Sequence, residues 1–146
     1  EEQRNAGPVL ALVETLKELS KIKVLDLSEC TLIGLSRHRY KGLNGLGDVF
    51  RERKNRLTHL RLCDNRLHSE AALIVAGWLP AVSKLRYLDI SSRAGFDPLC
   101  GALRTTLHLR TLRMEKCGLD DGEAEGVAAF LASSVRLERL DLSGNQ

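Results

Sequence analysis

The side chains of this sequence that could serve as nucleophiles, bases or metal ligands are its cysteines and histidines. Neither a CxxC pair nor a cysteine/histidine spacing typical of zinc occurs among the four cysteines, which are Cys30, Cys63, Cys100 and Cys117. Cys63 and His59 would face the same side of a strand, but four residues of strand separate them by about 13 Å, too far for a base to activate a thiol. Motifs of serine hydrolases, phosphate-binding loops and metalloproteases are absent from the sequence as well. We therefore predict a protein without a catalytic site, a metal or a cofactor.

The composition is that of an ordinary folded domain with a small excess of positive charge. Of the 146 residues, 43% are hydrophobic and 28% are charged, which excludes disordered and collagen-like chains. The chain has no apolar run long enough to span a membrane, and the acidic start EEQRNAGP lacks the features of a signal peptide. The net charge of +3 is too small to demand a nucleic acid or a membrane as partner. We interpret the cysteines as free thiols in a reducing compartment and expect an intracellular, cytoplasmic protein, with nuclear and ciliary locations left open.

A repeated leucine pattern divides the chain into units. The segments IKVLDLSECTL (22–32), LTHLRLCDNRL (57–67) and LRTLRMEKCGL (109–119) all match LxxLxLxx(N/C)xL. LRYLDISSR, from Leu85, and LERLDLSGN, from Leu137, match its first nine positions. The five starts, at residues 22, 57, 85, 109 and 137, are 35, 28, 24 and 28 residues apart. Since each pattern is typical of one short strand, we predict five parallel strands.

Apolar residues also recur at helical spacing between these patterns. They occupy the same offsets after the second and fourth patterns, namely Ala72, Val75 and Leu79, then Ala124, Val127 and Leu131. Trp78 and Phe130 each come one residue before the last member of a set. We expect them to pack between neighbouring helices, with Trp78 as an exposed anchor on the convex side as the alternative. A similar set ahead of residue 22 predicts that a helix of a preceding repeat covers 8–19.

The ninth position of each pattern lies where the strand ends and the backbone curls away. A small polar side chain there can bond amide groups that the curl leaves unpaired. The residues at this position are Cys30, Asn65, Arg93, Cys117 and Asn145. This mixture of cysteine and asparagine, with 28-residue units and a full helix, resembles the ribonuclease-inhibitor class of leucine-rich-repeat proteins, which includes the repeat domains of NOD-like receptors and of the Ran GTPase-activating protein. Arg93 is too large for the slot, so we expect an irregular third turn in which Phe96 takes the apolar position.

The resemblance covers nearly the whole chain. It implies an α/β fold, a leucine-rich-repeat solenoid in which a parallel concave sheet of five strands carries helices on its convex side. We expect one domain over 1–146. Because the chain starts in mid-repeat and neither end has the sequence of a polar cap, we expect it to be part of a longer array. The first unit is the longest, and we interpret 34–56 as an insertion that forms a loop.

Two rows of side chains should cross the concave face, because alternate residues of a strand point to the same side. Position five alternates in charge along the stack, with Asp26, Arg61, Asp89, Arg113 and Asp141. Position three is mixed, with Val24, His59, Tyr87, Thr111 and Arg139. The rows form either a self-neutralising ladder of weak ion pairs or a docking surface for a partner, since Tyr and Arg are favoured in interfaces.

The predicted insertion concentrates positive charge. It contains two acids and seven basic residues, which are Arg37, Arg39, Lys41, Arg51, Arg53, Lys54 and Arg56. Such a loop could contact RNA, an acidic partner or phospholipid headgroups, or it could simply be a solvated loop. The nucleic-acid alternative is weak, because the segment offers only Tyr40 and Phe50 for stacking on bases.

These observations favour a non-catalytic protein-interaction scaffold that binds a macromolecular partner on the concave sheet. The resemblance adds that related proteins use this face for protein ligands. Two alternatives remain. One is a structural subunit of a ribonucleoprotein or cytoskeletal assembly that docks through the basic insertion, and the other is a regulator such as a GTPase-activating or ubiquitin-ligase receptor segment. We expect no membrane partner, and the oligomeric state is left open.

Overall fold

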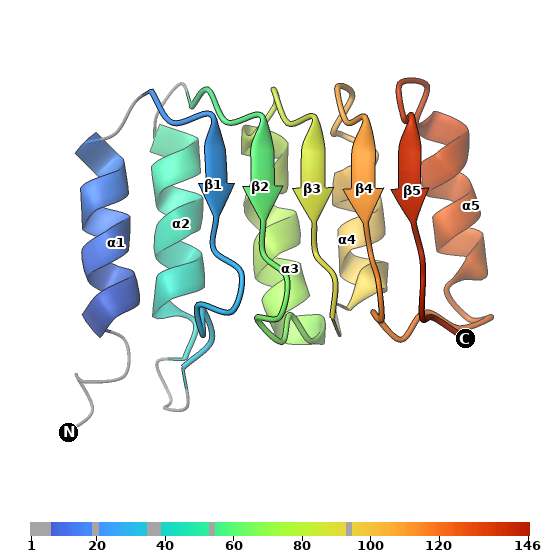
Figure 1. Ribbon diagram of the computed structural model, residues 1–146, viewed down its shortest axis with the longest axis horizontal. Coiled ribbons are helices and arrows are strands. Elements are labelled where there is room, and N and C mark those ends of the chain that lie inside the picture. Colours follow the sequence, from blue (N-terminus) through green and yellow to red (C-terminus); the bar gives the residue numbers. More distant parts are fainter. Residues whose placement is uncertain (1–6, 19–20, 35–38, 53–54, 93–94) are drawn as a thin grey trace.

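Five short strands form one parallel sheet in the computed structural model, which describes residues 7–18, 21–34, 39–52, 55–92 and 95–146. The strands are β1 (Val24–Asp26), β2 (His59–Arg61), β3 (Tyr87–Asp89), β4 (Thr111–Arg113) and β5 (Arg139–Asp141). Each strand pairs with the next one in sequence order (Figure 1). Every strand occupies positions three to five of its leucine pattern, so the predicted parallel sheet is confirmed.

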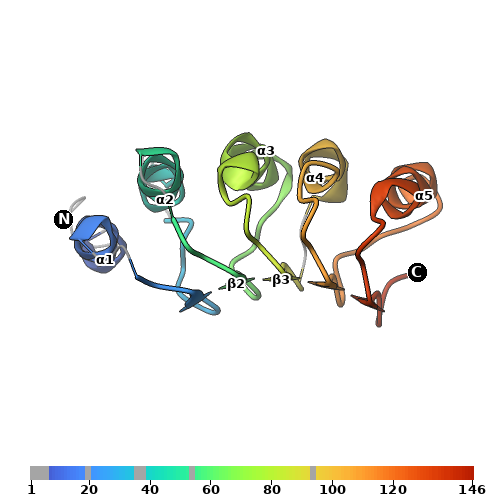
Figure 2. The same cartoon turned by 90° about the horizontal axis from the view of Figure 1, so that it is seen from above.

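A layer of helices covers one face of the sheet. The layer consists of α1 (Gly7–Glu18), α2 (Lys41–Glu52), α3 (Ser69–Trp78), α4 (Phe96–Leu103) and α5 (Ala124–Ser133), with a short 3-10 turn, η1 (Leu79–Ala81), after α3. Figure 2 shows the sheet on the inner, concave side of the curve and the helices along the outside. The α1 helix corresponds to the helix predicted at 8–19. None of the described helices is long and apolar enough to cross a membrane.

The core lies between the sheet and the helices and is built mainly from the leucine positions of the pattern. Position four is buried in the first four units, by Leu25, Leu60, Leu88 and Leu112. In the last unit Leu140 is only partly buried, and Leu131 of α5 is exposed although its spacing predicted an inward position. In the structure β5 is an edge strand, and among the described elements α5 packs only on α4.

Trp78 is buried at the end of α3, which confirms packing between helices and excludes the alternative of a convex anchor. Its ring packs on Phe50 of α2, with ring centroids 5.1 Å apart. Phe130, at the same offset of the repeat, is buried as well. The contact of Trp78 with Phe50 therefore joins α3 to α2.

The prediction that 34–56 forms an insertion loop is wrong. It contains α2, the regular helix of the first unit, whose Leu43, Leu46 and Phe50 lie in the core. Fourteen residues (27–40) separate β1 from α2, whereas seven (62–68) separate β2 from α3. The extra length therefore precedes the helix. Three glycines within α2, which lower helix propensity, hid the helical spacing of its apolar residues.

The ninth position has the role expected of it at the two asparagines. The side chains of Asn65 and Asn145 each bond backbone groups of their own turn and of the preceding unit. Cys117 is buried at the same position, whereas Cys30 of the first unit is exposed. Arg93, for which we expected an irregular turn, lies outside the described residues, and Phe96 is buried at the start of α4.

Candidate functional site

The strand register aligns the two predicted rows on the concave face of the sheet. Successive strands pair position for position, so each residue at position five lies beside the next, in the order Asp26, Arg61, Asp89, Arg113 and Asp141. Position three forms the neighbouring row, from Val24 through His59, Tyr87 and Thr111 to Arg139. Since the leucine between them points into the core, both rows face the concave side.

The acid-base row does not form a uniform ladder. Arg61 pairs with Asp26, with Nη1 and Oδ2 3.3 Å apart. On its other side Arg61 turns to an aromatic residue: Nη2 donates to the Tyr87 hydroxyl at 3.4 Å, and the guanidinium lies 5.5 Å from the ring centroid. No ion pair between Arg61 and Asp89 is found among the described residues. The row is therefore split into two clusters.

The first cluster is an amphipathic patch on β1 to β3, formed by Val24, His59, Arg61 and Tyr87. The rings of His59 and Tyr87 are stacked, with centroids 5.6 Å apart and planes 18° apart. Val24 leaves 64% of its surface exposed. The hydrogen bond to Tyr87, and after it the contact with Asp26, raises the pKa of Arg61. Stacked aromatic rings, an arginine and an exposed aliphatic side chain are the kind of surface that dominates protein interfaces.

The second cluster surrounds Arg113 on β4 with carboxylates. Its guanidinium lies 3.2 Å from oxygens of Asp89, Asp141 and Glu115. Asp89 is only 2% exposed, so water can hardly solvate its carboxylate. Its charge is therefore compensated chiefly by Arg113. A hydrogen bond with Tyr87, then those with the carboxylates, raises the pKa of Arg113. Lys116 also pairs with Glu115, at 2.9 Å, so three carboxylates meet two cations in this cluster.

The serines two residues after the aspartates of position five fix the carboxylates, a feature that the leucine pattern did not predict. The backbone N–H of the serine two residues later donates to Oδ1 at 3.0 Å in all three cases, which are Asp26 with Ser28, Asp89 with Ser91 and Asp141 with Ser143. The repeated D-x-S in LDLS, LDIS and LDLS was the available signal. These bonds hold the carboxylates in one orientation toward the concave face.

The same bonds predict an acid-sensitive fold. Hydrogen bonds from Ser28 and Ser143, and then the arginines, lower the pKa of Asp26 and Asp141. A carboxyl whose pKa is lowered by folding stabilises the fold above its unfolded pKa of about 3.9 and loses that contribution as pH falls through the folded value. We expect the melting temperature to fall as the pH drops below about 4, and to fall less in the Asp26→Asn/Asp141→Asn variant. Thermal unfolding followed by circular dichroism between pH 7 and 2 measures both, and equal acid sensitivity of the two proteins would contradict the assignment.

The basic residues of 34–56 do not form one surface. Arg39 pairs with Glu70 at 2.9 Å, and Lys41 is exposed at the start of α2. At the other end of the helix Arg51 donates to the backbone carbonyl of Gly77 at 3.0 Å, and Arg56 is exposed near β2. Arg37, Arg53 and Lys54 lie outside the described residues. A helix of twelve residues, about 18 Å long, therefore separates the two groups.

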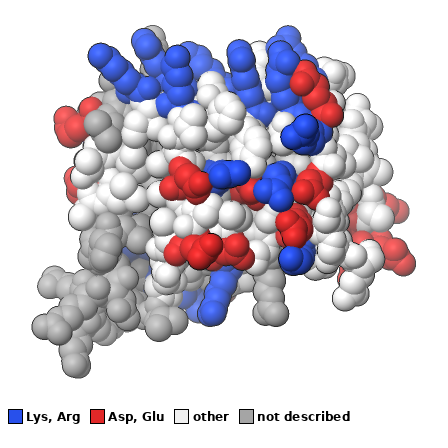
Figure 3. Space-filling model, in the orientation of Figure 1, with Lys and Arg blue, Asp and Glu red and all other residues white. Residues whose placement is uncertain are grey.

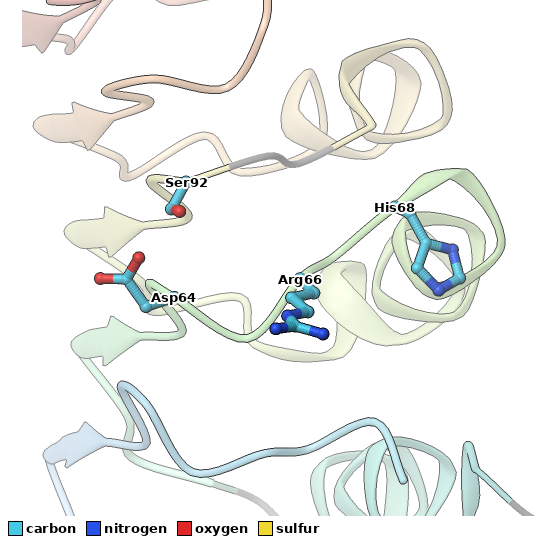
Figure 4. Close-up of a pocket in the computed structure, with 4 residues that line it drawn as sticks. All are labelled: Asp64, Arg66, His68 and Ser92. Carbon is cyan, nitrogen blue, oxygen red and sulfur yellow. The ribbon is translucent and has the colours of Figure 1, made fainter. Parts of the chain in front are cut away.

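The described cysteines and histidines do not converge on a reaction centre, and His38 lies outside the described residues. Cys63 donates to the Ser28 hydroxyl at 2.9 Å, and burial raises the pKa of its thiol, which disfavours the thiolate. Among the described residues no group of three His, Cys, Asp or Glu side chains could hold a metal ion. An open pocket of about 620 Å³ beyond the ends of β2 and β3 is lined by Asp64, Arg66, His68 and Ser92. Figure 4 shows these side chains spread along the turns instead of meeting at one point.

Stacked units of strand, turn and helix, with asparagines that bridge the turns, define a leucine-rich-repeat domain. No known family profile matches the chain. Its sequence is similar to human NACHT, LRR and PYD domains-containing protein 12, with 31% identity over 123 residues, or 78% of this chain and 12% of the length of the human protein. Its structure is similar to the C-terminal domain of tropomodulin from Caenorhabditis elegans, with a TM-score of 0.71, 15% identity and coverage of 92% of this chain and 82% of that one. The second likeness shows the fold, a leucine-rich-repeat solenoid.

Proposed function

We propose that this chain is a non-catalytic interaction module that binds another protein on the concave face of its sheet. The observation that carries the proposal is the amphipathic patch of Val24, His59, Arg61 and Tyr87, which combines exposed aliphatic surface, stacked rings and an oriented guanidinium. The Arg113 cluster beside it supplies a charged rim that would orient a partner. The mixture of Asn65 and Cys117 at position nine supports membership of the ribonuclease-inhibitor class.

Docking through a basic insertion would require one continuous basic surface. The described basic residues of 34–56 lie in two groups at opposite ends of α2, so we do not favour this alternative. For a GTPase-activating or ubiquitin-ligase receptor segment, we assign no residues. We propose an intracellular location on the ground that Cys30, Cys63 and Cys100 are free thiols in the structure.

A photo-crosslinking comparison tests the concave face directly. A photoreactive amino acid replaces Val24 on the concave side or Leu73 on the outside of α3; the two positions are matched because both are exposed aliphatic residues, 64% and 60% exposed. In cells that express the protein, we expect a discrete protein adduct at position 24 and none at position 73. Adducts of equal yield at the two positions, or adducts at 73 alone, would refute the proposal.

The same adduct provides a quantitative prediction for the patch. Replacing Tyr87 with alanine removes the ring that joins His59 and Arg61, and central interface tyrosines contribute about 2 kcal/mol or more, a loss of roughly thirtyfold in affinity. We expect the yield of the position-24 adduct to fall accordingly, while Tyr87→Phe, which keeps the ring, retains most of it. Thermal unfolding of each variant checks that the fold is intact.

A further inference from the structure

A second charged surface runs along the edge of the sheet where the strands begin. Each strand-opening leucine or isoleucine has one residue before it and one after it, giving ten positions in five units. Seven of the ten are lysine or arginine, and we call them the basic edge: Lys21, Lys23, Arg56, Lys84, Arg86, Arg110 and Arg136. All seven side chains are exposed. The remaining three positions hold Thr58, His108 and Glu138.

Backbone hydrogen bonds place the units of this edge side by side. The carbonyl of Lys23 accepts from the N–H of Thr58, whose carbonyl accepts from Arg86, each at 2.8 Å. The carbonyl of Arg86 accepts in turn from Arg110 at 2.8 Å. Since neighbouring strands are about 4.8 Å apart, the five units present a continuous cationic edge about 19 Å long. Figure 3 shows this edge as the row of blue side chains along the top.

Little within the described chain neutralises this edge. Glu138 is its one carboxylate and pairs with Arg110 at 2.6 Å. Among the described residues, no ion pair involves Lys84 or Arg86 at its centre. The helix ends on the same side are mixed, with Lys17, Arg51 and Arg104 against Glu18 and Glu52. Exposed like charges in a row repel one another, and an anionic partner would relieve that repulsion.

Two aliphatic side chains project beside these charges. Leu107 is 64% exposed and Val135 is 88% exposed, and each lies two residues before a strand-opening leucine. The basic edge thus offers apolar contacts as well as charge. Its ten positions hold none of the tyrosine, phenylalanine or tryptophan side chains on which bases stack, and Glu138 would repel phosphate, so the edge fits nucleic acid poorly.

We propose that the basic edge binds an extended, acidic segment of a partner protein, with carboxylates on Lys84 and Arg86 and apolar side chains on Leu107 and Val135. An extended chain advances about 3.3 Å per residue, so about six residues span the edge. Alternate side chains of such a segment point to the same side, which lets acidic residues face the cations while apolar ones reach the aliphatic pair. The basic edge and the concave patch are separate surfaces, and different variants test them.

The test uses a fluorescein-labelled peptide of twelve residues, three repeats of Glu-Leu-Glu-Thr, and the intact 146-residue chain. We expect saturable binding in fluorescence anisotropy that weakens with salt. Lys84→Glu/Arg86→Glu should weaken it by about tenfold or more. The matched control, Lys41→Glu/Arg66→Glu, makes the same change in net charge with exposed residues at the opposite edge, and it should change the affinity less than about twofold. Equal losses in the two pairs, or no binding by the wild-type chain, would overturn the proposal.

Further arms separate the class of partner. Leu107→Ser/Val135→Ser should lower the affinity for the leucine-containing peptide severalfold. The affinity for a peptide with glycine in place of leucine should stay unchanged. A twelve-nucleotide oligouridine and vesicles of phosphatidylserine and phosphatidylcholine are measured in the same buffer. Tighter binding of either probe than of the peptide would overturn the proposal in favour of RNA or an anionic membrane. All four substituted positions at the edge are exposed, and thermal unfolding verifies that the variants fold.

Discussion

Asn65→Ala should lower the free energy of unfolding by about 3 kcal/mol, the largest loss we expect from a single polar substitution in this chain. The Asn65 side chain is 3% exposed and bridges two units. Its Nδ2 donates to the carbonyls of Leu27, at 2.7 Å, and Leu62, at 3.0 Å, while Oδ1 accepts from the N–H of Leu32 at 3.2 Å. Alanine would leave these buried backbone groups without hydrogen-bond partners. Each such group costs about 1–3 kcal/mol, and hydrogen bonds from water would recover part of that cost.

Chemical denaturation measures this loss, and Asn145→Ala is the matched control. Asn145 makes the same three kinds of bond, to Met114, Leu142 and Leu119, but it is only partly buried. Water can therefore replace its amide, and we expect a loss of about 1 kcal/mol. The free energy of unfolding of Asn65→Cys should lie between those of the wild type and Asn65→Ala, because Cys117 donates from the same position to the carbonyl of Ile90. A loss for Asn65→Ala no larger than that for Asn145→Ala would show that the bridge is not a major stabilising element.

Gly47→Ala should destabilise the fold by about 1–3 kcal/mol, although alanine is the better helix former. Gly47 lies in α2 against α3, and a Cβ added to it would come within 2.6 Å of Cδ1 of Trp78. The indole ring cannot withdraw, since it is buried and packed on Phe50. Overpacking would therefore force the two helices apart.

Gly101→Ala is the control for this prediction because it makes the same substitution in another helix. Gly101 is exposed in α4, and a Cβ there would meet nothing within 4 Å. We expect it to raise the free energy of unfolding by about 0.5–1 kcal/mol through helix propensity alone. Opposite signs for the two variants in thermal unfolding would support the packing of α2 in the helix layer. If Gly47→Ala proved stabilising as well, the close approach of α2 to Trp78 would be wrong.

The sequence pattern did not predict the two clusters on the concave face. The alternation of Asp and Arg predicted an even row of ion pairs. Arg61 instead contacts Tyr87 on the side where the row places Asp89. Arg113 instead gathers Asp89, Asp141 and Glu115. Which partner an arginine takes depends on side-chain rotamers and on competing donors such as Ser91, and neither follows from the spacing of residues in the sequence.

The sequence by itself determined the strands, their order and the face that each side chain of a strand takes. It could do so because burial in a repeat follows a local period, and the same leucine positions recur in every unit. Tertiary structure alone decided that 41–52 is a helix, since its contacts with Trp78 outweigh the low propensity of its glycines. It also decided which charges meet, because residues such as Arg110 and Glu138 are distant in the chain and become neighbours only when the units stack.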